Sequence, residues 1–303
     1  MADLNGSVPT SELADAPDAR PGTADHEYNC RLWAPEHAQT LARHRALGAS
    51  ARDAPGVHLD LRWGALARQT LDIFLPQVTT TGALVVHVHG GYWQYQTSGK
   101  DGASFLAPAF VAHDCAFVAL QYALCPEVSM DGMVQQMRQA LDWVWRKLPE
   151  LGYQPRRTVL VGHSAGAHLV ATLGLTDWSA LGHTANPIAA ICGISGLYDL
   201  HPLVMTYLNR DLRMDPTCAA RNSPINWVRS GAPATLLAYG GRESESFAHQ
   251  TRDFARSLGE HGADVTQWEL DGYDHFSAIE VLTDASHPVL KGLLAHCKLN
   301  GGL

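Results

Sequence analysis

A serine between two glycines is the strongest candidate in this chain for a reactive side chain. Positions 162–166 read Gly-His-Ser-Ala-Gly, a G-x-S-x-G pattern centred on Ser164. An apolar run at 158–161 precedes the pattern and small residues follow it, which predicts a strand, a tight turn and a helix. Such a turn lifts the serine hydroxyl clear of the sheet and places the next amide, that of Ala165, at a helix N-terminus. We therefore predict Ser164 as a nucleophile and Ala165 as an oxyanion donor.

An activated serine needs a base, and the base needs an acid that orients it. Behind a G-x-S-x-G turn, the acid and then the histidine follow the serine along the chain. His275 comes directly after the last predicted strand and is the predicted base. Glu243 follows the strand predicted at 235–239 and is the preferred acid, while Asp199, after an earlier strand, stays open as the alternative. Asp274, beside the histidine, is interpreted as a solvated loop residue.

A second glycine-rich turn precedes the serine turn in the chain. Positions 89–93 read His-Gly-Gly-Tyr-Trp after a valine-rich run, at the place where lipases and esterases carry an oxyanion loop. Glycine amides can approach a substrate closely, so Gly90 and Gly91 are predicted oxyanion donors. Tyr92 and Trp93 are predicted to bind an aromatic substrate by stacking, or else to pack the loop as core aromatics.

The elements that must position these residues are short apolar strands that alternate with helices. Strands are predicted at 82–89, 115–122, 158–161, 189–194, 235–239 and 265–270. Helices are predicted at 133–148, 165–169 and 289–296, with one short helix between 28 and 52. This alternation predicts an α/β protein with a mainly parallel sheet flanked by helices, and the serine turn makes it an α/β-hydrolase fold. The stretch 198–227 fits the sheet pattern poorly and is expected to form a small cap.

Composition and charge narrow the class of protein. Of the 303 residues, 46% are hydrophobic and 17% charged, which is typical of a large core, and we predict a single domain over 26–303. Residues 1–25 lack periodicity and apolar content and are expected to be a disordered tail. A net charge of −8 with scattered basic residues argues against nucleic-acid binding. With no signal sequence and no apolar run of about 20 residues, a cytoplasmic protein without membrane association is predicted.

Neither a cofactor nor a metal is predicted. The six cysteines form no zinc or disulfide pattern and are interpreted as buried free thiols. The spacing of His87 and His89 could indicate a metal-binding pair, but no carboxylate-containing motif such as H-E-x-x-H accompanies them. The predicted partner is therefore a small molecule, and a homodimer stays open.

Several motifs together resemble the kynurenine formamidase (arylformamidase) group of α/β-hydrolases. They occur as His-Gly-Gly-Tyr-Trp at 89–93, Gly-His-Ser-Ala-Gly at 162–166, Gly-Leu-Tyr-Asp-Leu at 196–200 and Asp-His-Phe at 274–276. The segments at 27–31, 34–37 and 240–250 are also similar to that group, so the resemblance covers most of the chain.

The resemblance implies a triad and an activity. Ser164, Glu243 and His275 would be the nucleophile, acid and base, although members of the group usually carry Asp where this chain has Glu243. The implied reaction is hydrolysis of an aryl formamide such as N-formyl-kynurenine, a step of tryptophan catabolism, to formate and an arylamine through an acyl-enzyme on Ser164. A carboxylesterase, an aryl amidase or a carbamate hydrolase of the same fold is the alternative, because specificity lies in the pocket. A binding protein that has lost catalysis is a further alternative.

Overall fold

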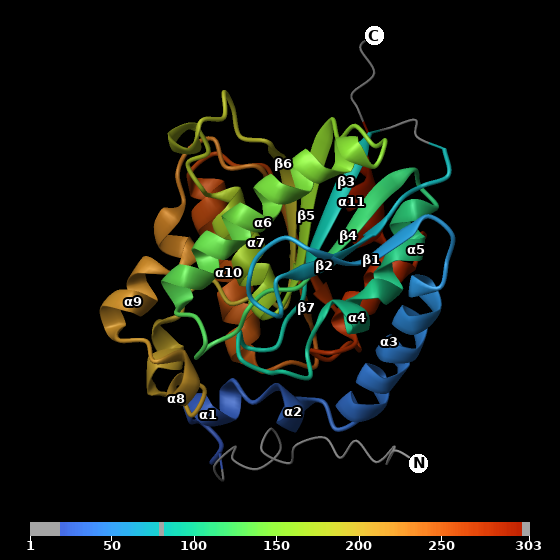
Figure 1. Cartoon of the computed structure of the whole chain (residues 1–303). Coiled ribbons are helices and arrows are strands. Elements are labelled where there is room, and N and C mark those ends of the chain that lie inside the picture. Colours follow the sequence, from blue (N-terminus) through green and yellow to red (C-terminus); the bar gives the residue numbers. More distant parts are fainter. Residues whose placement is uncertain (1–18, 79–81, 299–303) are drawn as a thin grey trace.

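One eight-stranded sheet organises the protein (Figure 1). The computed structural model describes residues 19–78 and 82–298. The sheet has the order β1-β2-β4-β3-β5-β6-β7-β8, in which β1 and β2 are antiparallel to their neighbours and the strands from β4 to β8 are parallel. The strands are β1 (Val57–Arg62), β2 (Thr70–Phe74), β3 (Ala83–Val88), β4 (Cys115–Leu120), β5 (Arg157–His163), β6 (Ile188–Ile194), β7 (Ala234–Gly240) and β8 (Val265–Leu270).

Helices cover both faces of the sheet. The helices are α1 (Ala24–Glu27), α2 (Cys30–Trp33), α3 (His37–Arg52), α4 (Lys100–Ala103), α5 (Ala107–Val111), α6 (Met130–Glu150), α7 (Ala165–Gly174), α8 (Asn209–Leu212), α9 (Pro216–Arg221), α10 (Glu245–Glu260) and α11 (Pro288–Cys297). α6, α7 and α10 pack on one face, and α3, α5 and α11 pack on the other (Figure 1). β3 is continuously apolar because both faces of the strand are buried. Val86 packs in the core between the sheet and α6, α7 and α10, and Val85 packs in the core between the sheet and α3, α5 and α11.

The predicted fold class is confirmed, but several elements were not predicted. β1 and β2 were missed because β1 is a half-exposed edge strand and β2 buries Asp72 in its middle, which hides the apolar pattern. α10 was missed although its apolar residues recur at helical spacing. The single short helix expected between 28 and 52 is wrong, because that stretch holds both α2 and the 16-residue α3. Most of the tail expected at 1–25 lies outside the described residues.

The segment expected to be a cap lies outside the sheet. It consists of α8, α9 and the 3-10 helices His201–Met205 and Pro224–Trp227. The N-terminal segment lies against it, because the backbone N–H of Tyr207 donates to Asp25 Oδ1 at 2.8 Å. Figure 1 shows α1, α2 and α8 at the same end of the molecule. Within the described residues, no helix is both long and apolar enough to cross a membrane.

A buried ionic cluster ties the antiparallel edge of the sheet to α3 and α4. Asp72 in β2 is fully buried and accepts hydrogen bonds from Lys100 Nζ at 2.9 Å and from Arg52 Nε at 2.9 Å. Lys100 Nζ also donates to Asp60 at 2.7 Å and to Asp101 at 3.1 Å. A buried carboxylate is tolerated only when charged partners satisfy it, so this cluster explains how an aspartate can occupy a core strand.

Lys100→Met is expected to lower the free energy of unfolding by about 3 kcal/mol, because it leaves Arg52 as the one charged partner of the buried Asp72 carboxylate among the described residues. Urea denaturation measures the change. Lys147→Met is the matched control, since Lys147 pairs with Glu150 on an exposed helix face and its loss should cost at most about 1 kcal/mol. Equal losses in the two variants would contradict the role of the cluster.

Candidate active site

Ser164 occupies a strained turn between β5 and α7. Its φ of 56° and ψ of −123° lie outside the regions that ordinary residues prefer, and its backbone N–H donates to the Ile194 carbonyl at 2.8 Å. The turn also needs glycine at position 166, where a Cβ would stand 2.0 Å from the Val88 carbonyl oxygen. This close approach of α7 to β3 places Ser164 at the carboxyl ends of the parallel strands, where such folds bind their ligands.

Three side chains form one hydrogen-bonded chain. Ser164 Oγ lies 3.0 Å from His275 Nε2, and His275 Nδ1 lies 2.7 Å from Glu243 Oε2. All three come from loops at the same edge of the sheet, after β5, β7 and β8. Both distances are within hydrogen-bonding range, so the imidazole can accept the serine proton while the carboxylate holds its opposite nitrogen.

Glu243 is the carboxylate that the structure brings to His275. Its other oxygen, Oε1, accepts a hydrogen bond from the Gly240 N–H at 2.6 Å and another from the Ser195 hydroxyl. These bonds turn the glutamate side chain, which is longer than that of an aspartate, back towards the imidazole. The alternative acid, Asp199, lies elsewhere, where its Oδ1 accepts from the backbone N–H of His201 at 3.0 Å.

The loop that carries His275 is held by its neighbour. Asp274 is buried, not solvated as predicted, and its Oδ1 accepts hydrogen bonds from the backbone N–H groups of Phe276 at 3.0 Å and Ser277 at 2.9 Å. The carboxylate thus satisfies a turn of backbone donors, which explains its burial. His163, from the end of β5, adds a further restraint, since its Nε2 donates to the His275 carbonyl oxygen at 2.7 Å.

The predicted oxyanion residues lie close to Ser164. Ala165 is the first residue of α7, directly after Ser164. Gly90, in the loop after β3, lies close to Ser164, because a Cβ added there would lie 3.0 Å from Ser164 Cβ and 3.0 Å from the His163 carbonyl oxygen. Gly91 follows with a φ of 109°. Backbone amides at these positions can therefore approach a substrate carbonyl bound to Ser164.

Gly90→Ala is expected to lower kcat/KM by roughly 10²-fold, because the added methyl displaces the loop from Ser164 and misaligns an oxyanion donor. Steady-state kinetics and thermal unfolding should be measured together, and the melting temperature should change little. Gly259→Ala is the control, since a Cβ there meets nothing within 4 Å. A Gly90→Ala enzyme with wild-type kinetics would show that this loop does not approach the reacting carbonyl.

The structure separates the two aromatic residues that were predicted to bind substrate. Tyr92 lines the cavity beside Ser164. Trp93 does not line it: its side chain is fully buried and its ring packs edge-on against His168, with centroids 5.0 Å apart. Of the two interpretations left open for Trp93, core packing therefore describes its position.

The two histidines before the glycine turn are buried and neutral. Burial lowers the pKa of both His87 and His89 to about 3. His89 stacks on Tyr122 at a centroid distance of 4.4 Å, and its Nδ1 donates to the Gly90 carbonyl oxygen at 2.7 Å. No group of three or more histidine, cysteine, aspartate or glutamate side chains suited to a metal occurs within 19–78 and 82–298.

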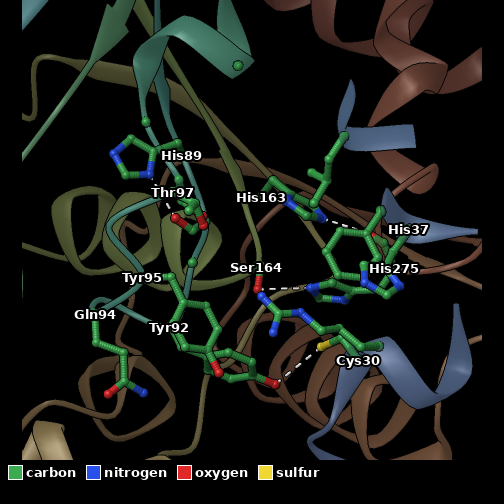
Figure 2. Close-up of a pocket in the computed structure, with 18 of the residues that line it drawn as sticks. Cys30, His37, His89, Tyr92, Gln94, Tyr95, Thr97, His163, Ser164 and His275 are labelled. Atoms are coloured by element: carbon green, nitrogen blue, oxygen red, sulfur yellow. Dashed lines mark hydrogen bonds between the residues drawn. The ribbon is translucent and has the colours of Figure 1, made fainter. Parts of the chain in front are cut away.

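A cavity of about 860 Å³ opens over Ser164 (Figure 2). Such a volume is in the range of sites that enclose small molecules. Its wall combines residues from α2, α3, the loop after β3 and the cap. They include the aromatic rings Tyr92, Tyr95, Phe105, Tyr207 and Phe276, and the charged side chains Arg31, Arg45, Arg210 and Asp211.

His275 is electrostatically tuned by its neighbours. Burial of the ring opposes its charged form, but Cys30 and Glu243 outweigh this effect and raise the pKa of His275 to about 10. A general base acts in its neutral form, so kcat/KM is expected to rise with pH on an acid limb above the ordinary histidine value.

Three residues beside the triad were not predicted from the sequence as site residues: Ser195, His163 and Cys30. Ser195 directly follows β6, at the same edge of the sheet as the other site residues, so its position in the sequence could have identified it as a site residue. His163 stands inside the serine motif. Cys30 is distant in sequence and had no signal beyond its place in a segment similar to the kynurenine formamidases.

A sheet of this order with a strained serine turn and an acid–histidine pair at its carboxyl edge defines an α/β-hydrolase of the serine-hydrolase type. A family model described as BD-FAE matches residues 71–258. The kynurenine formamidase of Danio rerio is 34% identical over 251 residues, which cover 80% of this chain and 83% of that protein. The chain therefore belongs to the BD-FAE family and is a kynurenine formamidase-like α/β-hydrolase.

Other relatives carry different names. Esterase LipQ of Mycobacterium tuberculosis is 26% identical over 276 residues, covering 80% of this chain and 64% of that protein. Among solved structures, a putative thioesterase from Silicibacter sp. tm1040 superimposes with a TM-score of 0.77 at 28% identity, covering 89% of this chain and 98% of the other. The similarity to named hydrolases thus extends from formamidases to esterases.

Proposed function

We propose that the protein hydrolyses an aryl formamide such as N-formyl-kynurenine, releasing formate and the arylamine through a formyl-enzyme on Ser164. The observation that carries the proposal is the hydrogen-bonded chain from Glu243 through His275 to Ser164, which faces the cavity. The choice of a formamide rests on the similarity to kynurenine formamidases.

In the first half-reaction, His275 Nε2 takes the Ser164 proton as the oxygen attacks the formyl carbon. The oxyanion is stabilised by backbone amides of Gly90, Gly91 and Ala165. The imidazolium then protonates the departing nitrogen as the C–N bond breaks. In the second half-reaction, His275 removes a proton from water, which attacks the formyl ester, and returns it to Ser164 as formate leaves.

The cavity wall supports a substrate that carries both an aromatic ring and a carboxylate. Tyr92, Tyr95 and Phe276 present ring surfaces on which an aryl leaving group can stack. Arg31, Arg45 and Arg210 outnumber the single acidic lining residue, Asp211, so the wall carries net positive charge. N-formyl-kynurenine has both an aryl ring and a carboxylate, which fits this combination.

Ester hydrolysis is the second candidate. Esterase LipQ and the putative thioesterase support it, and the same triad chemistry cleaves esters, thioesters and activated amides alike. An aryl amidase or a carbamate hydrolase would use the same steps with a larger acyl group.

Steady-state hydrolysis of N-formyl-kynurenine beside p-nitrophenyl acetate tests the proposal. We expect a kcat/KM for the formamide at least 10²-fold above that for the ester, because the cavity would hold its ring and carboxylate. N-formyl-aniline lacks the amino acid part and therefore tests whether the arginines bind the carboxylate. Its kcat/KM should be lower than that of N-formyl-kynurenine. A higher kcat/KM for the ester would reject the formamidase proposal in favour of an esterase.

A further inference from the structure

Two serines follow neighbouring strands at the carboxyl edge of the sheet. Ser164 comes directly after β5 and Ser195 directly after β6, and the last residues of these parallel strands, His163 and Ile194, are paired. Both serines have a left-handed backbone, with φ values of 56° and 52°. Ser164 is the proposed nucleophile, whereas the reaction steps given above assign no role to Ser195.

The Ser195 hydroxyl is directed at the acid of the triad. Ser195 is fully buried, and other residues line the cavity over Ser164. Its Oγ–H donates to Glu243 Oε1 at 2.5 Å, and the side chain of Glu243 is itself only 1% exposed. A carboxylate removed from water needs hydrogen-bond donors in place of water. The hydroxyl therefore serves Glu243 and not a bound substrate.

The backbone at position 195 would be more stable with a different residue. A φ of 52° lies in the left-handed region, which glycine enters freely and a residue with a Cβ enters with strain. Positions 193 and 196 are already glycines, and a Cβ there would stand 2.3 Å and 2.2 Å from Tyr198 Oη. Packing against Tyr198 thus fixes the shape of this turn. The turn itself does not require a serine, so what Ser195 adds is its hydroxyl.

The two carboxylate oxygens of Glu243 have different partners. Oε2 accepts from His275 Nδ1 at 2.7 Å, while Oε1 accepts from Ser195 and from the Gly240 N–H at 2.6 Å. A glutamate side chain has one more rotatable bond than an aspartate, so a single contact with the imidazole would leave its carboxylate free to turn. The two donors on Oε1 fix the plane of the carboxylate and hence the direction from which Oε2 meets Nδ1.

We propose that Ser195 is a positioning residue for the acid: its buried hydroxyl holds the Glu243 carboxylate in the orientation that keeps His275 aligned with Ser164. The hydroxyl stays a donor throughout the reaction, and no proton is transferred at Ser195. The proposal rests on the serine-hydrolase part of the proposed function and does not depend on the formamide substrate.

The rate at which a fluorophosphonate probe adds to Ser164 tests the proposal, because this rate measures the activation of the serine without any natural substrate. Ser195→Ala removes the hydroxyl, and its second-order rate constant should be roughly 10- to 30-fold below that of the wild type. Hydrolysis of p-nitrophenyl acetate should show a similar loss in kcat with little change in KM, since the cavity wall is unchanged.

Ser104→Ala is the matched control for the loss of a buried hydroxyl. Ser104 is also fully buried, but its hydroxyl donates to the Lys100 carbonyl oxygen at 2.9 Å. The rate constant of Ser104→Ala should stay within about twofold of the wild type, because its hydroxyl bonds to the backbone of α4. A rate constant for Ser195→Ala as high as that of Ser104→Ala would overturn the proposal.

Ser195→Gly separates the hydroxyl from the backbone. Glycine relieves the left-handed conformation, so this variant should unfold at the same temperature as Ser195→Ala or at a higher one. Its rate constant with the probe should nevertheless be as low as that of Ser195→Ala, within about threefold. A wild-type rate constant in Ser195→Gly would overturn the proposal, because activation of Ser164 would then follow the backbone conformation and not the hydroxyl.

A double-variant cycle shows whether Ser195 acts through the acid. Once Glu243→Gln has removed the charged acid, adding Ser195→Ala should lower the rate constant by less than about threefold, because the carboxylate that the hydroxyl positions is gone. Losses that multiply in full would mean that Ser195 acts independently of Glu243, and they would overturn the proposal.

The Nδ1–H proton of His275 gives a readout that a loss of packing elsewhere would not move. Its NMR signal, assigned by its absence from His275→Gln, should exchange with water faster in Ser195→Ala than in the wild type, and at the wild-type rate in Ser104→Ala. Equal exchange in Ser195→Ala and the wild type would overturn the proposal. A wild type that does not react with the probe would reject the triad and this proposal together, whereas one that reacts but leaves N-formyl-kynurenine intact would reject the formamide substrate alone.

Discussion

Ser164→Ala should lower kcat/KM by roughly 10⁴- to 10⁶-fold for every substrate that the protein hydrolyses. Alanine removes the only atom that forms the acyl-enzyme, while the backbone amides and the cavity remain. Those remaining parts can still hold a substrate next to water, so a weak residual rate is expected. Steady-state kinetics with the best substrate found for the wild type measure the loss.

The same variant has a chemical control. A fluorophosphonate probe should add to the wild type at Ser164, as located by peptide mass spectrometry, and should not add to Ser164→Ala. Thermal unfolding should show that the variant is folded, since the alanine methyl fits where the serine side chain was. Activity within tenfold of the wild type would reject Ser164 as the nucleophile and with it the whole triad.

Glu243→Gln should lower kcat/KM by about 10⁴-fold, equivalent to about 5 kcal/mol of transition-state stabilisation. Glutamine keeps the size of the side chain but loses its charge, and its amide can donate to Nδ1 and so favour the wrong tautomer of His275. Removing a charge that raises the pKa of His275 should also shift the acid limb of the pH profile to lower pH.

Two further variants make the assignment of the acid sharper. Glu243→Asp keeps the charge but shortens the reach to Nδ1, so an intermediate loss of about 10²-fold is expected. Asp199→Asn should change kcat/KM by less than about threefold, because Asp199 bonds to the backbone of its own loop. A larger loss in Asp199→Asn than in Glu243→Gln would transfer the role of the acid to Asp199.

Local sequence patterns determined much of the fold and of the candidate site. The serine turn could be recognised because Gly162 and Gly166 are required wherever a helix packs against a strand at such close range, and few other structures need that spacing. The parallel strands could be recognised because strands buried on both faces are continuously apolar. Chain order then predicted His275 and Glu243, since acid and histidine follow the serine along an α/β-hydrolase chain.

Only the tertiary structure decided the features that depend on contacts between distant segments. β2 could not be recognised because Asp72 in its middle is neutralised by Lys100, a partner 28 positions away. The position of Trp93 in the core depends on His168, which the loop sequence does not contain. Cys30 reaches the wall of the cavity over Ser164 because hydrogen bonds attach the N-terminal segment to Ser244 and Gln250, more than 200 positions later. Sequence patterns report the burial and turns of neighbouring residues, whereas these contacts arise from packing between segments that no local pattern links.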